Sequence, residues 1–274
     1  MLHKLRGLLD RSILGAHRLY FLILFKRKPG RGEYCNSKRI RLYDSPVWPA
    51  KHRPYLAVIR CGSSHSLIDD GSSRNFDLAL NRYAKPDTAH KADWEYLYVG
   101  GVNKYKAAFQ FIGESHLANY RGFVFLDDDV EMTYSDLSSF LTFCSTHGFG
   151  LAQPSLTPDS IVSHRHLINV SNRGWRSVPL VEVMCPYFSA SALREALPTF
   201  DLSYSTWGLD FVWPRLFAFS PVVVDEFRAK HVRALGRSGF YQYMRRIGVS
   251  PQQELEKLKN SAVRRLGAES VGVL

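Results

Sequence analysis

The chain has 274 residues, of which 45% are hydrophobic and 22% are charged. This composition excludes a disordered, collagen-like or disulfide-scaffold protein and suits one α/β domain with small appendages. The net charge of +11 is uneven, because residues 1–54 hold 13 Lys and Arg against 3 Asp and Glu, whereas the other 220 residues hold 23 against 22. A nucleic-acid-binding domain more often spreads its basic excess over the folded surface, so that class is disfavoured.

Residues 1–28 are basic and contain the apolar stretch ILGAHRLYFLILF, which His17 and Arg18 interrupt. The stretch is shorter than the roughly 20 apolar residues of a membrane-spanning helix, and no small-residue cleavage site of a signal peptide follows it. We therefore predict an amphipathic arm on an anionic membrane surface. The alternative is a helix that packs on the domain or on a partner protein. Residues 29–53 are rich in Lys, Arg, Pro and Gly and are predicted to be a linker.

The four cysteines are widely spaced and form no C-x-x-C pair, which argues against a zinc site. Two of them, Cys61 and Cys185, lie in apolar stretches and are expected to be reduced core residues. We expect a reducing compartment, so the predicted location is the cytoplasm, with the arm holding the protein at the cytoplasmic membrane face.

Apolar runs alternate with amphipathic segments from residue 54 to residue 248, which is the predicted catalytic domain. Continuous apolar runs predict buried strands, and strands that alternate with helices predict an open, mostly parallel α/β sheet flanked by helices. The predicted strands are 55–62, 75–84, 94–101, 122–129, 148–155 and 221–227, and the predicted helices are 104–119, 134–147 (capped by Thr133 or Ser135) and 191–197.

The last predicted element is a peripheral basic helix in residues 249–274. Ser250 is placed to cap it, Pro251 suits its first position, and Gly267 is the predicted stop.

Residues 123–132, FVFLDDDVEM, place three aspartates directly after an apolar strand. Ligands of open α/β sheets bind beyond the carboxyl ends of the strands. In an extended chain Asp127 and Asp129 project to one side and Asp128 to the other. Mg²⁺ or Mn²⁺ prefers carboxylate oxygens and often also binds substrate phosphates. The residues therefore predict a metal site, and the alternative is a solvated acidic loop.

This stretch resembles the D-x-D motif of GT-A type glycosyltransferases, with Asp127 and Asp129 as its two acids. STWGLDFVWP (205–214) is similar to the W-G-x-D/E segment found downstream in several GT-A families, and VVVDEFRAKHVR (222–233) puts His231 after the last core strand. The order of RCGSSHSL, FDLALNRY, KYKAAF, FLDDDVE, AQPSL and WGLDFVWP, over about residues 55–232, looks closest to the little-characterised family catalogued as domain of unknown function 707.

The resemblance implies a Rossmann-like GT-A fold and transfer of a sugar from a nucleotide-sugar to an acceptor hydroxyl. Together with the basic arm, this class of enzyme suggests a place in surface polysaccharide or glycolipid synthesis. It implies that Mn²⁺ or Mg²⁺ is bound by Asp127, Asp129 and His231 and that Asp210 is the catalytic base. For the donor nucleotide, the resemblance implies a phosphate contact from Arg60, a base or ribose contact from Asp77, a diphosphate contact from Lys104, and a ribose or backbone contact from Asp128.

Each of these residues also has a purely structural interpretation. Asp210 could stabilise a helix N-terminus, His231 could be a surface histidine, and Lys104 a solvated first-turn lysine. Arg60 and Asp77 could form strand-end ion pairs. The two histidines of SHRH (163–166) could bind one ion together or contact acceptor or donor phosphates, and their structural interpretation is a pair of solvated loop residues.

Three other classes of protein remain as alternatives. A haloacid-dehalogenase-like phosphatase would need Gly-Thr soon after the second acid, where this chain has VEM (130–132). A nucleotidyltransferase would begin with a glycine-rich basic loop, and RCGSSHSL (60–67) matches such a loop poorly. The presence of all three acids and of Asp210 argues against a non-catalytic glycan-binding or scaffold protein.

Overall fold

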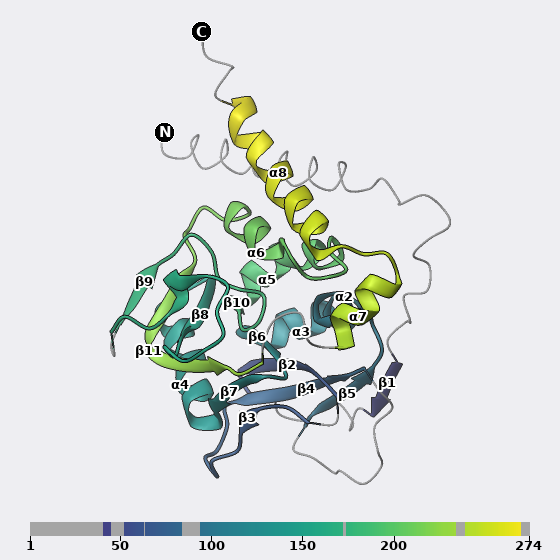
Figure 1. Cartoon of the computed structure of the whole chain (residues 1–274). Coiled ribbons are helices and arrows are strands. Elements are labelled where there is room, and N and C mark those ends of the chain that lie inside the picture. The colour runs from purple at the N-terminus through teal and green to yellow at the C-terminus, as the bar shows by residue number, and fades with distance from the viewer. Residues whose placement is uncertain are drawn as a thin grey trace, which may run out of the picture. The chain divides into compact units, whose positions relative to one another are not determined.

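Figure 1 shows the computed structural model of the chain, which describes residues 41–44, 52–62, 64–83, 94–171, 174–233 and 239–269. The predicted arm, 1–28, and most of 29–53 lie outside the described residues. All the described residues belong to one compact unit, Lys38–Leu274. Among these residues, no helix combines the length and the apolar character that a membrane span requires.

The described strands form one sheet with the order β1-β5-β4-β2-β6-β10-β8-β11-β7-β3, and β9 pairs with β11. Neighbours among β5, β4, β2 and β6 are parallel, as are β8 and β11, whereas β10 runs antiparallel between β6 and β8. The predicted fold class, a mostly parallel open α/β sheet, is confirmed. The strands are β1 (Arg41–Asp44), β2 (Tyr55–Cys61), β3 (Leu67–Ile68), β4 (Phe76–Arg82), β5 (Tyr96–Val99), β6 (Gly122–Asp127), β7 (Val130–Thr133), β8 (Leu151–Leu156), β9 (Trp175–Ser177), β10 (Tyr187–Ser189) and β11 (Val222–His231).

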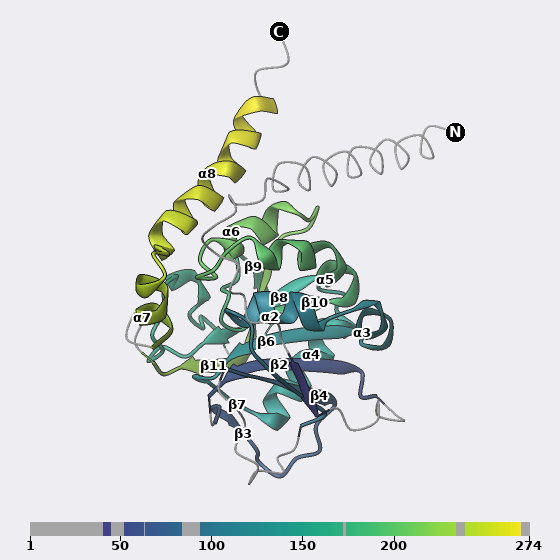
Figure 2. The same ribbon diagram turned by 90° about the vertical axis from the view of Figure 1, so that its right-hand side faces the viewer.

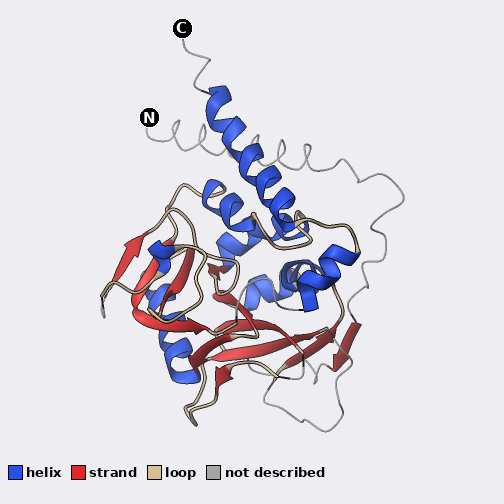
Figure 3. Ribbon diagram, in the orientation of Figure 1, coloured by secondary structure: helices blue, strands red, loops and turns tan. Residues whose placement is uncertain are grey.

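Helices cover both faces of the sheet, as Figures 2 and 3 show. α4 packs against β7, β10 and β11, while α2 packs against β2 and α5 against β6 and β10. The central strands are therefore buried on both faces, which explains their continuous apolar sequence. The helices are α2 (Lys104–Phe111), α3 (Glu114–Asn119), α4 (Tyr134–Thr146), α5 (Ala190–Ala196), α6 (Leu209–Val212), α7 (Gly239–Arg246) and α8 (Pro251–Glu269), with short 3₁₀ turns at Arg165–Leu167, Leu197–Asp201 and Trp213–Arg215.

The chain reverses after β6, and this reversal positions the acidic cluster. β7 leaves the turn at Asp128 and Asp129 and pairs antiparallel with the end of β11, so that His231 lies opposite Val130. β11 is longer than the predicted strand 221–227 and includes His231 as its last residue. This pairing brings the third aspartate beside a residue about 100 positions later in the chain.

The predicted helix 104–119 is wrong in one respect, because it is two helices. Ile112 ends α2 in an extended conformation, and Gly113 is extended at the start of α3. The N–H of Gly113 donates to Nδ1 of His116 at 3.2 Å, which supplies a partner at the new helix start. Periodicity continues across the break and so conceals it.

Two predicted boundaries and one predicted placement are also corrected. Residues 41–44 of the predicted linker form β1, which pairs with β5. The C-terminal helix is not peripheral along its described side chains, because α8 packs on α6 and buries Leu258. It also continues past Gly267 to Glu269, since a glycine weakens a helix without necessarily ending it. Thr133 does cap α4, accepting from the N–H of Asp136 at 3.1 Å.

Candidate active site

The last aspartate of the cluster and the last residue of β11 form the centre of the site. Nε2 of His231 lies 3.5 Å from Oδ2 of Asp129, and both side chains are about nine-tenths buried. The other ring nitrogen, Nδ1, lies 2.7 Å from the carbonyl oxygen of Ile161. A backbone carbonyl can only accept, so Nδ1 carries a proton, and Nε2 is the ring nitrogen that faces Asp129.

Asp129 and His231 shift each other's pKa. Burial acts to raise the pKa of Asp129, but the hydrogen bond and charge of His231, with the charge of Arg233, hold it below its ordinary value. Burial acts to lower the pKa of His231, but Asp129 and the carbonyl of Ile161 raise it above its ordinary value. Each group therefore favours the charged form of the other.

The donor set of this pair fits a hard or borderline divalent cation. Oδ1 of Asp129 is buried and has no hydrogen-bond partner among the described residues, and an imidazole nitrogen stands beside it. Within the described part of the chain, no group of three or more His, Cys, Asp or Glu side chains is already arranged to hold a metal ion. Mg²⁺ and Mn²⁺ often take only one or two protein carboxylates and complete their shell with phosphate and water oxygens, so two residues suffice for a start.

Asp127 lies at the end of β6 beside a buried lysine. Nζ of Lys104, the first residue of α2, lies 2.8 Å from Oδ1 of Asp127, and also contacts the carbonyl of Val183 at 2.8 Å. The lysine side chain is 3% exposed and the aspartate side chain 41% exposed. Lys104 is therefore a buried partner of Asp127 and not a solvated first-turn lysine, and its contact with a diphosphate stays a prediction.

Asp128 lies in the turn that follows β6 and contacts two other side chains. Its Oδ1 lies 3.1 Å from a guanidinium nitrogen of Arg233, and the hydroxyl of Tyr83 donates to its Oδ2 at 3.4 Å. Burial and the neighbouring aspartates raise the pKa of Asp128 despite this arginine. Its predicted ribose contact stays a prediction, since in this structure protein groups occupy both oxygens.

Asp210 lies in the first turn of α6 and is 8% exposed. The turn before it is strained: Thr206 has φ of 72° and Gly208 φ of 90°, and Thr206 is the only non-glycine residue with positive φ in the described chain. Strain of this kind is held in place by surrounding contacts and gathers at functional sites. Here Glu254 of α8 accepts from the backbone N–H groups of Tyr204 and Ser205 at 2.9 and 2.7 Å.

Two acidic and basic groups that the motifs did not identify lie beside Asp210. Nε2 of His164 is 3.8 Å from Oδ2 of Asp210, and this hydrogen-bonding neighbour raises the pKa of His164. Glu182 is 5% exposed and interacts electrostatically with His164, Asp210 and His231. SHRH was a weak signal for His164. Nothing in the sequence around Glu182 distinguished it from other acids beside apolar segments.

Arg60 does not present its guanidinium to a ligand in this structure. Nη1 binds Oδ1 of Asn81 and the carbonyl of Gly100, and Nη2 binds the carbonyls of Gly101 and Val102 at 3.0 and 3.2 Å. Burial lowers its pKa. The predicted phosphate contact is therefore replaced by a structural role, in which Arg60 fixes the loop that leads into α2 and Lys104.

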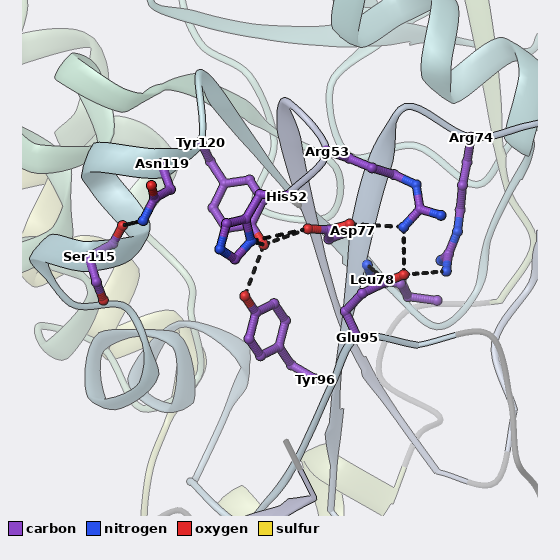
Figure 4. Close-up of polar contacts among 10 residues, drawn as sticks. All are labelled: His52, Arg53, Arg74, Asp77, Leu78, Glu95, Tyr96, Ser115, Asn119 and Tyr120. Atoms are coloured by element: carbon purple, nitrogen blue, oxygen red, sulfur yellow. Dashed lines mark hydrogen bonds and ion pairs between the residues drawn. The ribbon is translucent and has the colours of Figure 1, made fainter. Parts of the chain in front are cut away.

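Asp77 lies at the other end of the sheet and is not brought into the site. It is fully buried near the start of β4, where Oδ1 accepts from Arg53 at 2.9 Å and Oδ2 from the hydroxyl of Tyr120 at 2.7 Å (Figure 4). Arg60 pairs in register with both Asn81 and Asp127, and Asn81 follows Asp77 by four residues, about 13 Å along a strand. The predicted base or ribose contact of Asp77 is corrected to an internal ion pair.

Comparisons with known proteins bear on the fold alone. No protein-family model and no curated protein matches the chain, so the resemblance to domain of unknown function 707 stays a prediction from the motifs. Solved structures with a similar arrangement include GalNAc-T7 with UDP, GalNAc and Mn²⁺, at 9% identity and TM-score 0.48, covering 76% of this chain and 48% of that one. Staphylococcus aureus TarS 1–349 in complex with UDP-GlcNAc has 12% identity and TM-score 0.45, covering 80% and 76%.

A third structure is the mannosyltransferase PcManGT from Pyrobaculum calidifontis in complex with GDP-Man and Mn²⁺. It has 11% identity and TM-score 0.46, and the match covers 96% of this chain and 87% of that one. All three TM-scores lie below 0.5 and all identities below 25%. The functional argument therefore rests on the residues of the site.

Proposed function

We propose that this protein is a metal-dependent glycosyltransferase that moves a sugar from a nucleotide-sugar to an acceptor hydroxyl. The observation that carries the proposal is the Asp129–His231 pair at the carboxyl edge of the sheet, with an unpartnered buried oxygen on Asp129. The charges of both Asp127 and Asp210 act on the buried Tyr105, and this supports the proposal that Asp210 is the general base of the same site.

Each side chain has a defined task in such a reaction. Asp129 and His231, with Asp127, would hold Mn²⁺ or Mg²⁺, which when bound neutralises the diphosphate leaving group. Lys104 adds a fixed positive charge on the same side. Asp210 accepts the proton of the acceptor hydroxyl if configuration is inverted, and positions the acceptor if it is retained.

Titration calorimetry with a panel of UDP, GDP, CDP and their sugar derivatives, with and without Mn²⁺, tests the proposal. We expect Mn²⁺-dependent binding that Asp129→Asn weakens by at least about tenfold, because one charged ligand is lost. Asp136→Asn, an aspartate on α4, is the control and should bind as the wild type does. Metal-independent binding, or no binding by any member of the panel, would exclude the proposed function.

Reaction products separate this proposal from the nucleotidyltransferase alternative. A glycosyltransferase releases a nucleoside diphosphate from the nucleotide-sugar, whereas a nucleotidyltransferase releases pyrophosphate from a nucleoside triphosphate. We expect Asp210→Asn to reduce the release of nucleoside diphosphate in the presence of acceptor by about 100-fold or more, and to leave donor affinity within about threefold.

We also propose that residues 1–28 bind anionic membranes, on the basis of their charge and apolar stretch. The proposed location is the cytoplasmic membrane face. Cosedimentation with vesicles of phosphatidylglycerol and phosphatidylcholine should fall to background when residues 1–28 are deleted, and should fall in high salt. Equal sedimentation of the full chain and the deleted chain would exclude this role.

A further inference from the structure

Glu182 is a buried acid whose backbone is fixed beside the acidic cluster. Its N–H donates to Oε1 of Gln153 at 2.7 Å. Two residues later, the carbonyl of Met184 accepts from the N–H of Asp127 at 2.9 Å, and the carbonyl of Val183 accepts from Lys104. The position of Glu182 is therefore determined by the same elements that position the first acid of the D-x-D motif.

The carboxyl group of Glu182 has one oxygen without a partner. Oε2 is buried and makes no hydrogen bond to any described residue, and the side chain is contacted by the hydroxyl of Ser163. A buried carboxylate oxygen that has lost water without gaining a donor is costly, and such groups in native proteins call for a specific reason. A substrate that supplies a donor is one such reason.

The surroundings of Glu182 indicate which part of a substrate would meet it. The charges of His164, Asp210 and His231 all act on Glu182, and these three residues come from three different segments of the chain. The neighbouring carbonyl of Val183 accepts from Lys104, the partner of Asp127, so Glu182 lies beside the groups where the diphosphate is expected, and it interacts electrostatically with Asp210, where the acceptor hydroxyl is expected. In a direct transfer the group between leaving group and acceptor is the sugar itself.

We propose that Glu182 contacts the sugar that is transferred, with Oε2 accepting a hydrogen bond from a hydroxyl group of the donor's sugar ring. The inference rests on the proposed function and adds a specificity-determining residue to it. A site built to hydrogen-bond a hydroxyl rejects a ligand that lacks it far more strongly than an apolar site distinguishes sizes. Glu182 would therefore select among nucleotide-sugars by the position of one hydroxyl.

The test compares Glu182→Gln with the wild type by calorimetry in Mn²⁺, using UDP, UDP-glucose, UDP-N-acetylglucosamine, GDP and GDP-mannose. For the nucleotide-sugar that the wild type binds most tightly, we expect affinity to fall about tenfold, while affinity for the matching nucleoside diphosphate stays within about twofold. If the Gln variant does not fold, Glu182→Asp keeps the charge but retracts the carboxylate, and the same selective loss is expected.

Asp225→Asn is the matched control, because Asp225 is also buried but already accepts from Nε of Arg176 at 2.9 Å. It should leave both affinities unchanged. Equal weakening of diphosphate and nucleotide-sugar by Glu182→Gln would overturn the inference, as would no weakening of either. If the wild type binds no nucleotide with Mn²⁺, the proposed function fails as well. If it binds nucleotides but the variant shows no selective loss, only the role of Glu182 fails.

Discussion

Each of the three adjacent aspartates has a basic partner, and Arg233 lies near two of them, 3.1 Å from Asp128 and 3.7 Å from Asp129. This arrangement relieves the repulsion that three neighbouring carboxylates would otherwise suffer. It also divides the cluster, because the partner of the exposed first acid is a lysine and the partner of the buried third acid is an imidazole that can bind metal. The pairs are Asp127 with Lys104, Asp128 with Arg233, and Asp129 with His231.

A second histidine, His116, is expected to make the stability of the fold depend on pH. Burial, and to a smaller extent the charge of His52, lowers the pKa of His116 from 6.5 to about 4. The unfolded chain therefore binds a proton below pH 6.5 that the folded chain does not bind until about pH 4. Stability falls as pH falls through this window, by roughly 2 kcal/mol between pH 7 and pH 5.

Urea unfolding at pH 7 and pH 5 checks this prediction with His116→Gln. Gln can still accept from the N–H of Gly113, as Nδ1 of His116 does, but it does not titrate. The variant should lose about 2 kcal/mol less than the wild type between the two pH values. An unchanged difference would show that His116 is not responsible.

At the scale of elements, the start of α2 connects the sheet edge to the loop that carries Asp210. Asn103 caps the helix through Oδ1, which accepts from the N–H of Lys106 at 2.8 Å. Its Nδ2 donates to the carbonyls of Ser203 and Tyr204 at 3.0 and 2.8 Å. The side chain of Asn103 therefore stabilises the start of α2, which carries Lys104. It also binds the Ser203–Tyr204 segment, which lies about 100 positions later in the chain.

We predict that Asn103→Ala lowers the free energy of unfolding by about 3 kcal/mol, because a cap and two further buried hydrogen bonds are lost. Thr133→Ala is the matched comparison, since Thr133 is the N-cap of α4 and makes its cap bond to the N–H of Asp136. That change should cost about 1 kcal/mol. Equal losses in chemical denaturation would contradict the linking role of Asn103.

At the scale of the whole molecule, the C-terminal helix completes the domain. Glu254 of α8 accepts from the hydroxyl of Ser203 at 3.0 Å as well as from two backbone N–H groups of the same loop. A methyl group on Gly208 would approach Leu258 of α8 at 3.0 Å, so the WGLD turn and α8 are in close contact. The last helix therefore supports the loop that leads into α6, where Asp210 lies.

We predict that Glu254→Gln reduces transfer activity at least about tenfold while Mn²⁺-dependent nucleotide binding changes less than twofold. An amide has only one acceptor oxygen for three donors, so the loop before Asp210 loses its support. Glu256→Gln, an exposed change on the same helix, should have no effect. Activity assays measure transfer and calorimetry measures nucleotide binding. Equal losses of transfer and of nucleotide binding would contradict a role of Glu254 that is limited to the loop before Asp210.

Local patterns in the sequence determined the strands, most helices and the acidic end of β6. These features follow from side-chain burial and backbone preference over a few residues, which a sequence displays directly. Asp127, Asp129 and Lys104 were singled out in this way, and the resemblance to GT-A segments added Asp210 and His231; the roles of these residues stay predictions.

Only the tertiary structure decided which of these groups meet and which do not. The antiparallel pairing of β7 with β11 brings His231 to Asp129, and the register of β2 with β4 keeps Asp77 about 13 Å from the level of Asp127. Glu182, His164 and Glu254 became visible only through such long-range packing. The positions of these three residues depend on contacts with residues distant in the chain. A local sequence pattern reflects only neighbouring residues, so it does not predict such contacts.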